Sequence, residues 1–199
     1  NKWINRRLYQ DLCDTIITTG NAIAKQLIAD INVPEEKVVS LATGIEPPDA
    51  LQDSDQARLS LVNELSVDTR TRFVGSVSML RDWKGHLVLI DAFDKIKEEI
   101  PNHHLVIVGE GDFLETLQQD VFIRNIADRV HFTGYRDDPW PYFRAFDCNV
   151  LASTKNEGIP QVLMQAMFAR CPVIGTTVGG MPDIIQDGIT GRIVPPGDA

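Results

Sequence analysis

The chain has 199 residues, of which 43% are hydrophobic and 24% charged, as expected for a globular protein with at least one full core. Its formal net charge of −9 argues against a nucleic-acid partner, because nucleic-acid-binding domains usually carry a basic face. No uncharged apolar run approaches the roughly 18 residues that a membrane span needs.

Short β-branched runs alternate with amphipathic stretches, which is typical of an α/β fold with a parallel sheet. Several of the runs are apolar without alternation, as in strands covered by helices on both faces. The expected strands cover residues 15–19, 38–42, 72–77, 104–108, 130–133, 147–151, 173–176 and 192–194. The expected helices cover residues 21–30, 54–65, 85–99, 112–125, 139–145, 160–170 and 182–186.

Residues 44–52 interrupt this pattern with a glycine, two prolines and acidic residues, and they predict a hinge or linker. Residues 1–43 hold only two expected strands, too few for an independent sheet domain. We therefore expect them to be the tail end of a domain whose body is missing, and residues 53–199 to form a second domain. The first residues lack a start methionine and the apolar core of a signal peptide, so we expect a piece of a longer protein.

The cysteines and histidines do not predict a metal site. Cys13, Cys148 and Cys171 lack metal-ligand spacing, and the four histidines are scattered. Cys148 and Cys171 lie in apolar runs, so we expect buried reduced thiols and a cytoplasmic protein.

The segment 151–170 combines a buried-type strand, a polar loop and a helix that begins with Pro160. The next amides, from Gln161 and Val162, have no intrahelical partner and lie at the positive end of the helix dipole. Such a helix start at the carboxyl edge of a parallel sheet predicts an anion site. An ordinary helix start is the alternative, since every helix has free amides there.

Two polar residues favour the anion site. Gln165 is isolated in an otherwise apolar helix, and a buried amide needs partners, either a ligand or nearby backbone. Glu157 precedes the helix and would repel an anion, so we expect it to face hydroxyl groups; a solvated loop charge is the alternative.

The same run resembles the family 4 (group 1) glycosyltransferases, whose signature is a serine, a spacer, Glu-Gly, a second glutamate eight positions after the first, Pro-Val and a Gly-Gly turn. The matching residues are Ser153, Glu157-Gly158, position 165, Pro172-Val173, Gly179-Gly180, Asp187-Gly188, Thr190-Gly191 and Val194-Pro195-Pro196-Gly197-Asp198. Further matches upstream are Val74-Gly75, Lys84-Gly85-His86, Val108-Gly109-Glu110-Gly111 and Val130-His131-Phe132-Thr133-Gly134.

The resemblance implies a retaining enzyme of GT-B fold, in which two Rossmann-like domains face each other across a cleft and the C-terminal one binds a nucleotide-sugar. It implies no metal or other cofactor. Glu157 is then the catalytic residue, and Glu157 and Gly158 contact the transferred sugar. The diphosphate is expected at Lys84, Arg81, Ile159, Pro160, Gln161 and Val162, the ribose at Gln165, and the base at Gly134, Tyr135 and Arg136.

Three positions depart from the family pattern. The second glutamate is Gln165, which still accepts a hydrogen bond but carries no charge. The phosphate-binding arginine falls on Met79, and Arg81 lies two residues later, on the same face of an extended segment. The acidic residue after the Gly-Gly turn is Asp183 rather than glutamate.

We therefore expect the donor-binding part of a transferase that moves a hexosyl-type sugar to a glycan or lipid-linked acceptor held by the missing N-terminal domain. The expected pathway is lipopolysaccharide or exopolysaccharide synthesis, and the expected location is cytoplasmic, with peripheral attachment at the inner membrane face left open. We expect the fragment alone to be inactive. The alternatives are a non-catalytic nucleotide-sugar-binding module, a GT-B sugar-nucleotide epimerase, or an α/β interaction domain. For Lys84 itself, the alternative to a diphosphate contact is a surface lysine paired with Asp82.

Overall fold

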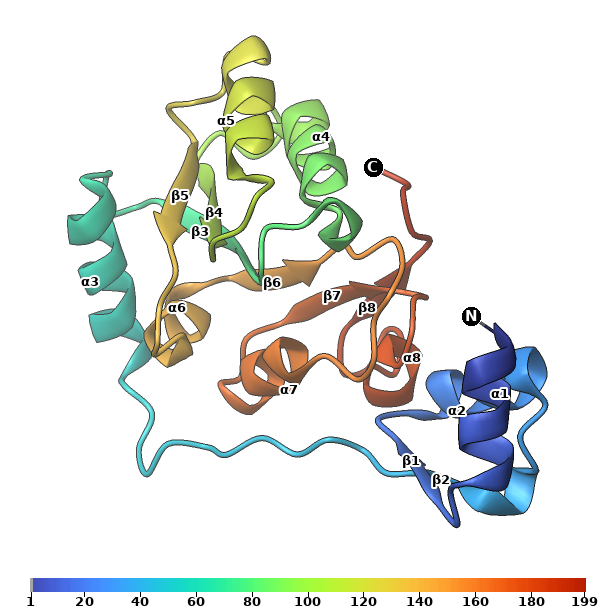
Figure 1. Ribbon diagram of the computed structural model, residues 1–199. Coiled ribbons are helices and arrows are strands. Elements are labelled where there is room, and N and C mark those ends of the chain that lie inside the picture. The colour runs from blue at the N-terminus through green and yellow to red at the C-terminus, as the bar shows by residue number, and fades with distance from the viewer. Residues whose placement is uncertain (1) are drawn as a thin grey trace.

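The computed structural model describes residues 2–199, which form a small N-terminal part and a larger parallel-sheet part (Figure 1). The N-terminal part contains α1 (Lys2–Asp11), β1 (Ile16–Thr18), α2 (Asn21–Ile31), the 3-10 turn η1 (Glu35–Lys37) and β2 (Val38–Ser40), with the two strands parallel. Residues 41–53 then run without helix or strand to α3 (Ser54–Leu65), and they include the expected linker 44–52. Helix α1 was not expected, because it has neither acidic residues in its first turn nor basic residues in its last.

Six parallel strands form the main sheet in the order β5-β4-β3-β6-β7-β8. Their bounds are β3 (Arg72–Val77), β4 (His103–Val108), β5 (Val130–Gly134), β6 (Cys148–Leu151), β7 (Val173–Thr176) and β8 (Arg192–Val194). The chain builds outward from β3 to β5, returns to β6 beside β3, and then builds outward in the other direction. This confirms the predicted Rossmann-like sheet, and the reversal between β3 and β6 creates a crevice at the carboxyl ends of the strands.

Helices cover both faces of the sheet, as predicted (Figure 1). On one face α4 (His86–Ile96) and α5 (Leu114–Ile123) pack through buried residues such as Ile90 and Leu117. On the other face lie α3, α6 (Trp140–Ala145), α7 (Gln161–Phe168) and α8 (Met181–Ile184). Gly75 in β3 makes close packing possible there, because a Cβ at this position would lie 1.9 Å from Cε2 of Phe146.

Four predicted helices are shorter than expected at their carboxyl ends. The predictions 85–99 and 182–186 correspond to α4 and α8, which end at Ile96 and Ile184. The predictions 112–125 and 160–170 correspond to α5 and α7, which end at Ile123 and Phe168. Asn125 and Arg170 have positive φ angles of 55° and 62°, and a left-handed residue at this place terminates a helix.

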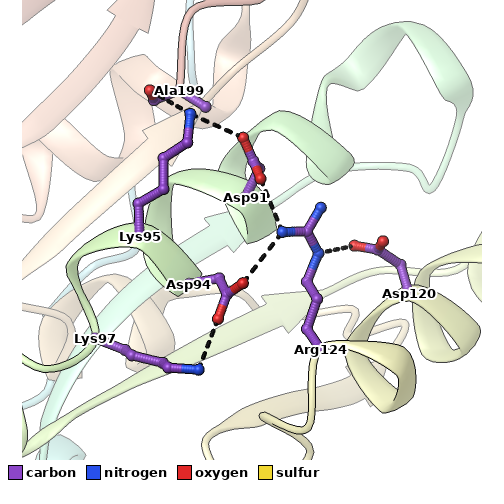
Figure 2. A network of polar contacts seen from close by, with 7 residues as sticks. All are labelled: Asp91, Asp94, Lys95, Lys97, Asp120, Arg124 and Ala199. Atoms are coloured by element: carbon purple, nitrogen blue, oxygen red, sulfur yellow. Dashed lines mark hydrogen bonds and ion pairs between the residues drawn. The ribbon is translucent and has the colours of Figure 1, made fainter.

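An ion-pair network joins α4 to the end of α5 (Figure 2). Arg124 binds Asp91 at 2.8 Å, Asp94 at 3.3 Å and Asp120 at 2.8 Å, and these carboxylates raise the pKa of its guanidinium, Asp120 most. Because α4 ends here shortly before β4 begins, the network lies at the amino edge of the sheet. It stabilises the helix pair on the side opposite the crevice.

Candidate functional site

The loops after β3, β4 and β5 and the start of α7 enclose a cleft of about 820 Å³. The lining includes residues that the sequence predicted for a site: Arg81, Tyr135, Arg136, Gln161, Val162 and Gln165. It also includes Glu110, Asp112 and Asp137, to which the sequence assigned no role. Glu110 could have been found, because it belongs to the matched Gly109-Glu110-Gly111 motif.

Lys84 and Glu157, which do not line this cleft, form an ion pair with each other. The Nζ atom of Lys84 donates to Oε1 of Glu157 at 2.5 Å, and the hydroxyl of Ser153 donates to the same oxygen at 2.6 Å. The side chains of Lys84 and Glu157 are only 14% and 7% exposed, and Ser153 is buried. Lys84 is therefore not a surface lysine paired with Asp82; the cation near Asp82 is Lys155, at 3.8 Å.

Glycines allow the loops that carry this pair to approach closely. Gly85 ends the 3-10 turn η2 (Asp82–Lys84) with φ of 72°, and a Cβ there would lie 1.9 Å from the carbonyl oxygen of Ala152. Gly179 has φ of 61°, and a Cβ there would lie 2.0 Å from the carbonyl oxygen of Glu157. Larger residues at either position would separate the loops and so disrupt the site.

A buried histidine packs beneath the Lys84 loop. His86 is 1% exposed, and its Nε2 atom lies 3.0 Å from the hydroxyl of Ser78, which lines the cleft. Burial, and then the charge of Lys84, lower the pKa of His86 to about 4. The imidazole is therefore neutral near pH 7, and Lys84 carries the local positive charge.

Arg81 also lines the cleft, in the loop between β3 and η2. Its guanidinium is paired with the exposed carboxylate of Asp112. Met79, at the position where the resembling family has arginine, lines the same cleft and is 59% exposed. Arg81 is thus the arginine that this loop presents to the cleft.

The amides before and at the start of α7 differ in availability. The Ile159 amide donates to the carbonyl of Thr19 at 3.1 Å, and Pro160 has no N–H. Neither residue lines the cleft, whereas Gln161 and Val162 do. Of the four residues from Ile159 to Val162 expected at the diphosphate, only Gln161 and Val162 therefore offer amides to the cleft, and their position at the helix start leaves these amides without intrahelical partners.

Gln165 lies one turn further along α7 and is half-buried in the cleft. Among residues 2–199, no group forms a hydrogen bond with its side-chain amide. The alternative that Gln165 is bonded to neighbouring backbone is thus not observed. Its amide is available to a ligand.

Tyr135 and Arg136 line the cleft, whereas Gly134, the last residue of β5, does not. Tyr135 is 59% exposed, and its hydrogen bond with Asp137 raises the pKa of the phenol. Arg136 donates to Glu64 at 2.6 Å and to the hydroxyl of Tyr142 at 2.6 Å, two contacts that the sequence did not predict. These contacts fix the Arg136 side chain.

Further observations concern metals, thiols and membranes. Among residues 2–199, no group of three or more His, Cys, Asp or Glu side chains could hold a metal ion. Cys171 is buried and Cys148 half-buried, and burial raises the thiol pKa values to about 12 and about 11. In the same part of the chain no helix has the length and apolar character to cross a membrane.

Comparisons with known proteins identify relatives over most of the chain. The family model described as glycosyl transferases group 1 matches residues 69–199. An N-acetyl-alpha-D-glucosaminyl L-malate synthase of Bacillus anthracis is 35% identical over 138 residues, which is 69% of this chain and 36% of that protein. A GDP-mannose-dependent phosphatidylinositol monomannoside mannosyltransferase of Mycobacterium tuberculosis is 28% identical over 187 residues, 90% of this chain and 48% of that protein.

Solved structures show the same fold. The Anabaena protein HepE in complex with UDP-glucose superposes with a TM-score of 0.86 at 24% identity, over 99% of this chain and 54% of that one. The C-terminal domain of a glycosyl transferase group 1 protein of Francisella tularensis superposes with a TM-score of 0.64 at 26% identity, over 78% of this chain and 82% of that one. The chain spans about half or less of the curated relatives named above. It belongs to the group 1 glycosyltransferases, and its Rossmann-like parallel α/β fold matches those of GT-B enzymes.

Proposed function

We propose that the chain binds a nucleotide-diphospho-sugar as the donor part of a retaining family 4 glycosyltransferase that transfers a hexosyl-type sugar. The observation that carries this proposal is the Lys84–Glu157–Ser153 cluster, whose residues follow β3 and β6 at the reversal point of the sheet, with Glu157 in the loop that leads into α7. A cation and helix amides favour a phosphate, while a buried carboxylate favours hydroxyl donors. A ligand with both groups side by side is a sugar diphosphate.

The roles of the residues follow from their positions. Lys84, Arg81 and the amides of Gln161 and Val162 bind the diphosphate and stabilise the negative charge that develops on it as it departs. This arrangement needs no metal ion, because cations and a helix dipole supply the compensation.

Glu157 and the Gly158 peptide face the sugar, where the carboxylate accepts hydrogen bonds from hydroxyl groups. Gln165, whose amide is free, binds the ribose. Tyr135 and Arg136, which line the cleft, contact the base together with the preceding Gly134.

We propose that residues 1–43 belong to an N-terminal acceptor domain, that 44–52 are the hinge, and that 53–199 form the donor domain. The irregular residues 41–53 and the superposition on an isolated C-terminal domain of the same family support this division. The acceptor in this proposal is a glycan or lipid-linked sugar, and the setting is lipopolysaccharide or exopolysaccharide synthesis in the cytoplasm. An amylovoran biosynthesis glycosyltransferase of Erwinia amylovora, 29% identical over 181 residues, supports a role in glycan synthesis.

The test is ligand-dependent thermal stabilisation of the chain by UDP, GDP, UDP-glucose and GDP-mannose. We expect at least one nucleotide-sugar to raise the Tm of wild type and not that of Lys84→Ala. Lys155→Ala is the matched control, because Lys155 lies in the same region but is 60% exposed. Equal shifts in wild type and Lys84→Ala would contradict the assignment of Lys84.

Two alternatives are separated by assays on the full-length protein. A non-catalytic module binds donor without transferring sugar to any acceptor. A sugar-nucleotide epimerase converts the donor when no acceptor is present, whereas the proposed transferase leaves the sugar configuration unchanged.

A further inference from the structure

The turn between β1 and α2 contacts the loop that follows β6. The carbonyl of Thr19 accepts a hydrogen bond from the Ile159 amide at 3.1 Å. Two residues later, the Asn21 amide donates to Oδ2 of Asp183, on α8, at 3.1 Å. The N-terminal part is therefore joined to two segments beside Glu157.

Glycines make this contact close on both sides. A Cβ at Gly158 would lie 3.0 Å from Oγ1 of Thr19, and a Cβ at Gly20, whose φ is 140°, would lie 3.1 Å from Cγ1 of Ile159. On the opposite side, the Gly180 amide donates to the Gly158 carbonyl at 2.8 Å. The Gly158–Ile159 peptide is thus held between the β1–α2 turn and the segment before α8.

Asp183 supplies what the start of α2 lacks. Gly20, at the N-cap, has no side chain to bond the free amides of the helix. The Asp183 carboxylate bonds the first of these amides and lies at the positive end of the helix dipole. A cap that comes from α8 fixes the position of α2 relative to α8.

We infer that Asp183 is a positioning residue for the sugar-binding peptide. By holding the start of α2 on α8, it keeps the Thr19 carbonyl on the Ile159 amide and so fixes the orientation of the Gly158–Ile159 peptide that follows Glu157. This inference rests on the proposed function, in which Glu157 and Gly158 face the sugar. Lys84, Gln161 and Val162 make none of these contacts, so Asp183 affects recognition of the sugar and not of the diphosphate.

The test compares Asp183→Ala and Asp183→Glu with Asp187→Ala. Asp187 is the matched control, because its carboxylate also bonds a backbone amide, that of Ile193 at 2.9 Å, but does not bond the N-terminal part. Hydrogen exchange at the Asn21 and Ile159 amides reports the contact itself. Calorimetry with UDP and UDP-glucose, and with GDP and GDP-mannose, separates the nucleotide from the sugar.

We expect Asp183→Ala to speed exchange at Asn21 and Ile159 and to weaken nucleotide-sugar binding about three- to tenfold, while nucleoside diphosphate affinity stays within about twofold. Asp183→Glu, which keeps the carboxylate, should show exchange rates and ligand affinities close to those of wild type. Asp187→Ala should show wild-type exchange at Asn21 and Ile159 and wild-type ligand affinities. Wild-type exchange at Ile159 in Asp183→Ala, or equal loss of both ligands, would overturn the inference. If the wild-type chain binds neither UDP and UDP-glucose nor GDP and GDP-mannose, the proposed function is wrong, and the role of Asp183 in sugar recognition is wrong with it. If only the role of Asp183 is wrong, the wild-type chain still binds these ligands.

Discussion

The two ways of breaking the Lys84–Glu157 pair should have unequal effects on stability. Lys84→Ala leaves the Glu157 carboxylate, 7% exposed, with the Ser153 hydroxyl as its remaining partner among residues 2–199. Glu157→Gln leaves an ammonium group on a long, flexible stem that can turn toward water. We expect the free energy of unfolding to fall by about 3 kcal/mol in Lys84→Ala and by about 1 kcal/mol in Glu157→Gln.

The magnitude follows from the geometry of the pair. At 2.5 Å and an effective dielectric constant of about 20, the attraction is about 7 kcal/mol before the cost of removing both charges from water. Removing one partner of a buried pair typically costs about 3–5 kcal/mol. We take the lower end, because Ser153 still bonds the carboxylate and neither side chain is completely buried.

A double-mutant cycle measured by urea unfolding tests this reasoning. The variant Lys84→Ala/Glu157→Gln removes both charges, so it should be more stable than Lys84→Ala by about 1–2 kcal/mol. Additive losses, with no interaction energy between the two positions, would refute the reasoning. They would mean that the pair contributes nothing beyond the packing of its two side chains.

The same variants separate the two roles in binding. Lys84→Ala should weaken nucleoside diphosphate binding by about 1.5–3 kcal/mol, the scale of a hydrogen bond to a charged group. Glu157→Gln should strengthen it several-fold, because the carboxylate no longer competes for Lys84 or repels the phosphate. Calorimetry with UDP and GDP measures both, and a loss of affinity in Glu157→Gln would place Glu157 at the phosphate.

Three further predictions concern single residues. The free energy of unfolding should fall by about 3 kcal/mol from pH 6.5 to pH 4, because the unfolded chain protonates His86 near 6.5 and the folded chain only near 4; His86→Gln should flatten this dependence in urea titrations. Gln165→Glu should bind ribonucleotides at least as tightly as wild type, and clear weakening in calorimetry with an intact fold would show that the cleft requires a neutral group. Gly75→Ala should abolish the cooperative thermal transition, because its Cβ would meet the Phe146 ring; a Tm within a few degrees of wild type would contradict this packing.

The sequence predicted most of the fold because local patterns define it. The strands expected at 72–77, 173–176 and 192–194 have the bounds of β3, β7 and β8. They are short, mainly apolar runs next to polar or turn residues, so each end is marked in the sequence itself. The start of α7 was also predicted, because Pro160 marks it locally.

The contacts within the site could not be predicted, because they join distant segments. Lys84 and Glu157 are 73 positions apart in the chain. The only carboxylate that the sequence suggested as a partner of Lys84 was its near neighbour Asp82. Ile159 was expected to contact the diphosphate, but its amide donates a hydrogen bond to the Thr19 carbonyl of the N-terminal part. Only the tertiary arrangement decides which polar groups remain available.

The pairing of the cations has a consequence for donor recognition under the proposed function. Both cations assigned to the diphosphate, Lys84 and Arg81, are already bound to carboxylates, Glu157 and Asp112. A free diphosphate must compete with these carboxylates and also meets their repulsion. A complete nucleotide-sugar meets less competition from Glu157, because its sugar hydroxyls donate hydrogen bonds to that carboxylate. These hydrogen bonds replace part of the stabilisation that Lys84 gives to Glu157. The site therefore favours the complete donor over its nucleotide product, and this preference should disappear in Glu157→Gln.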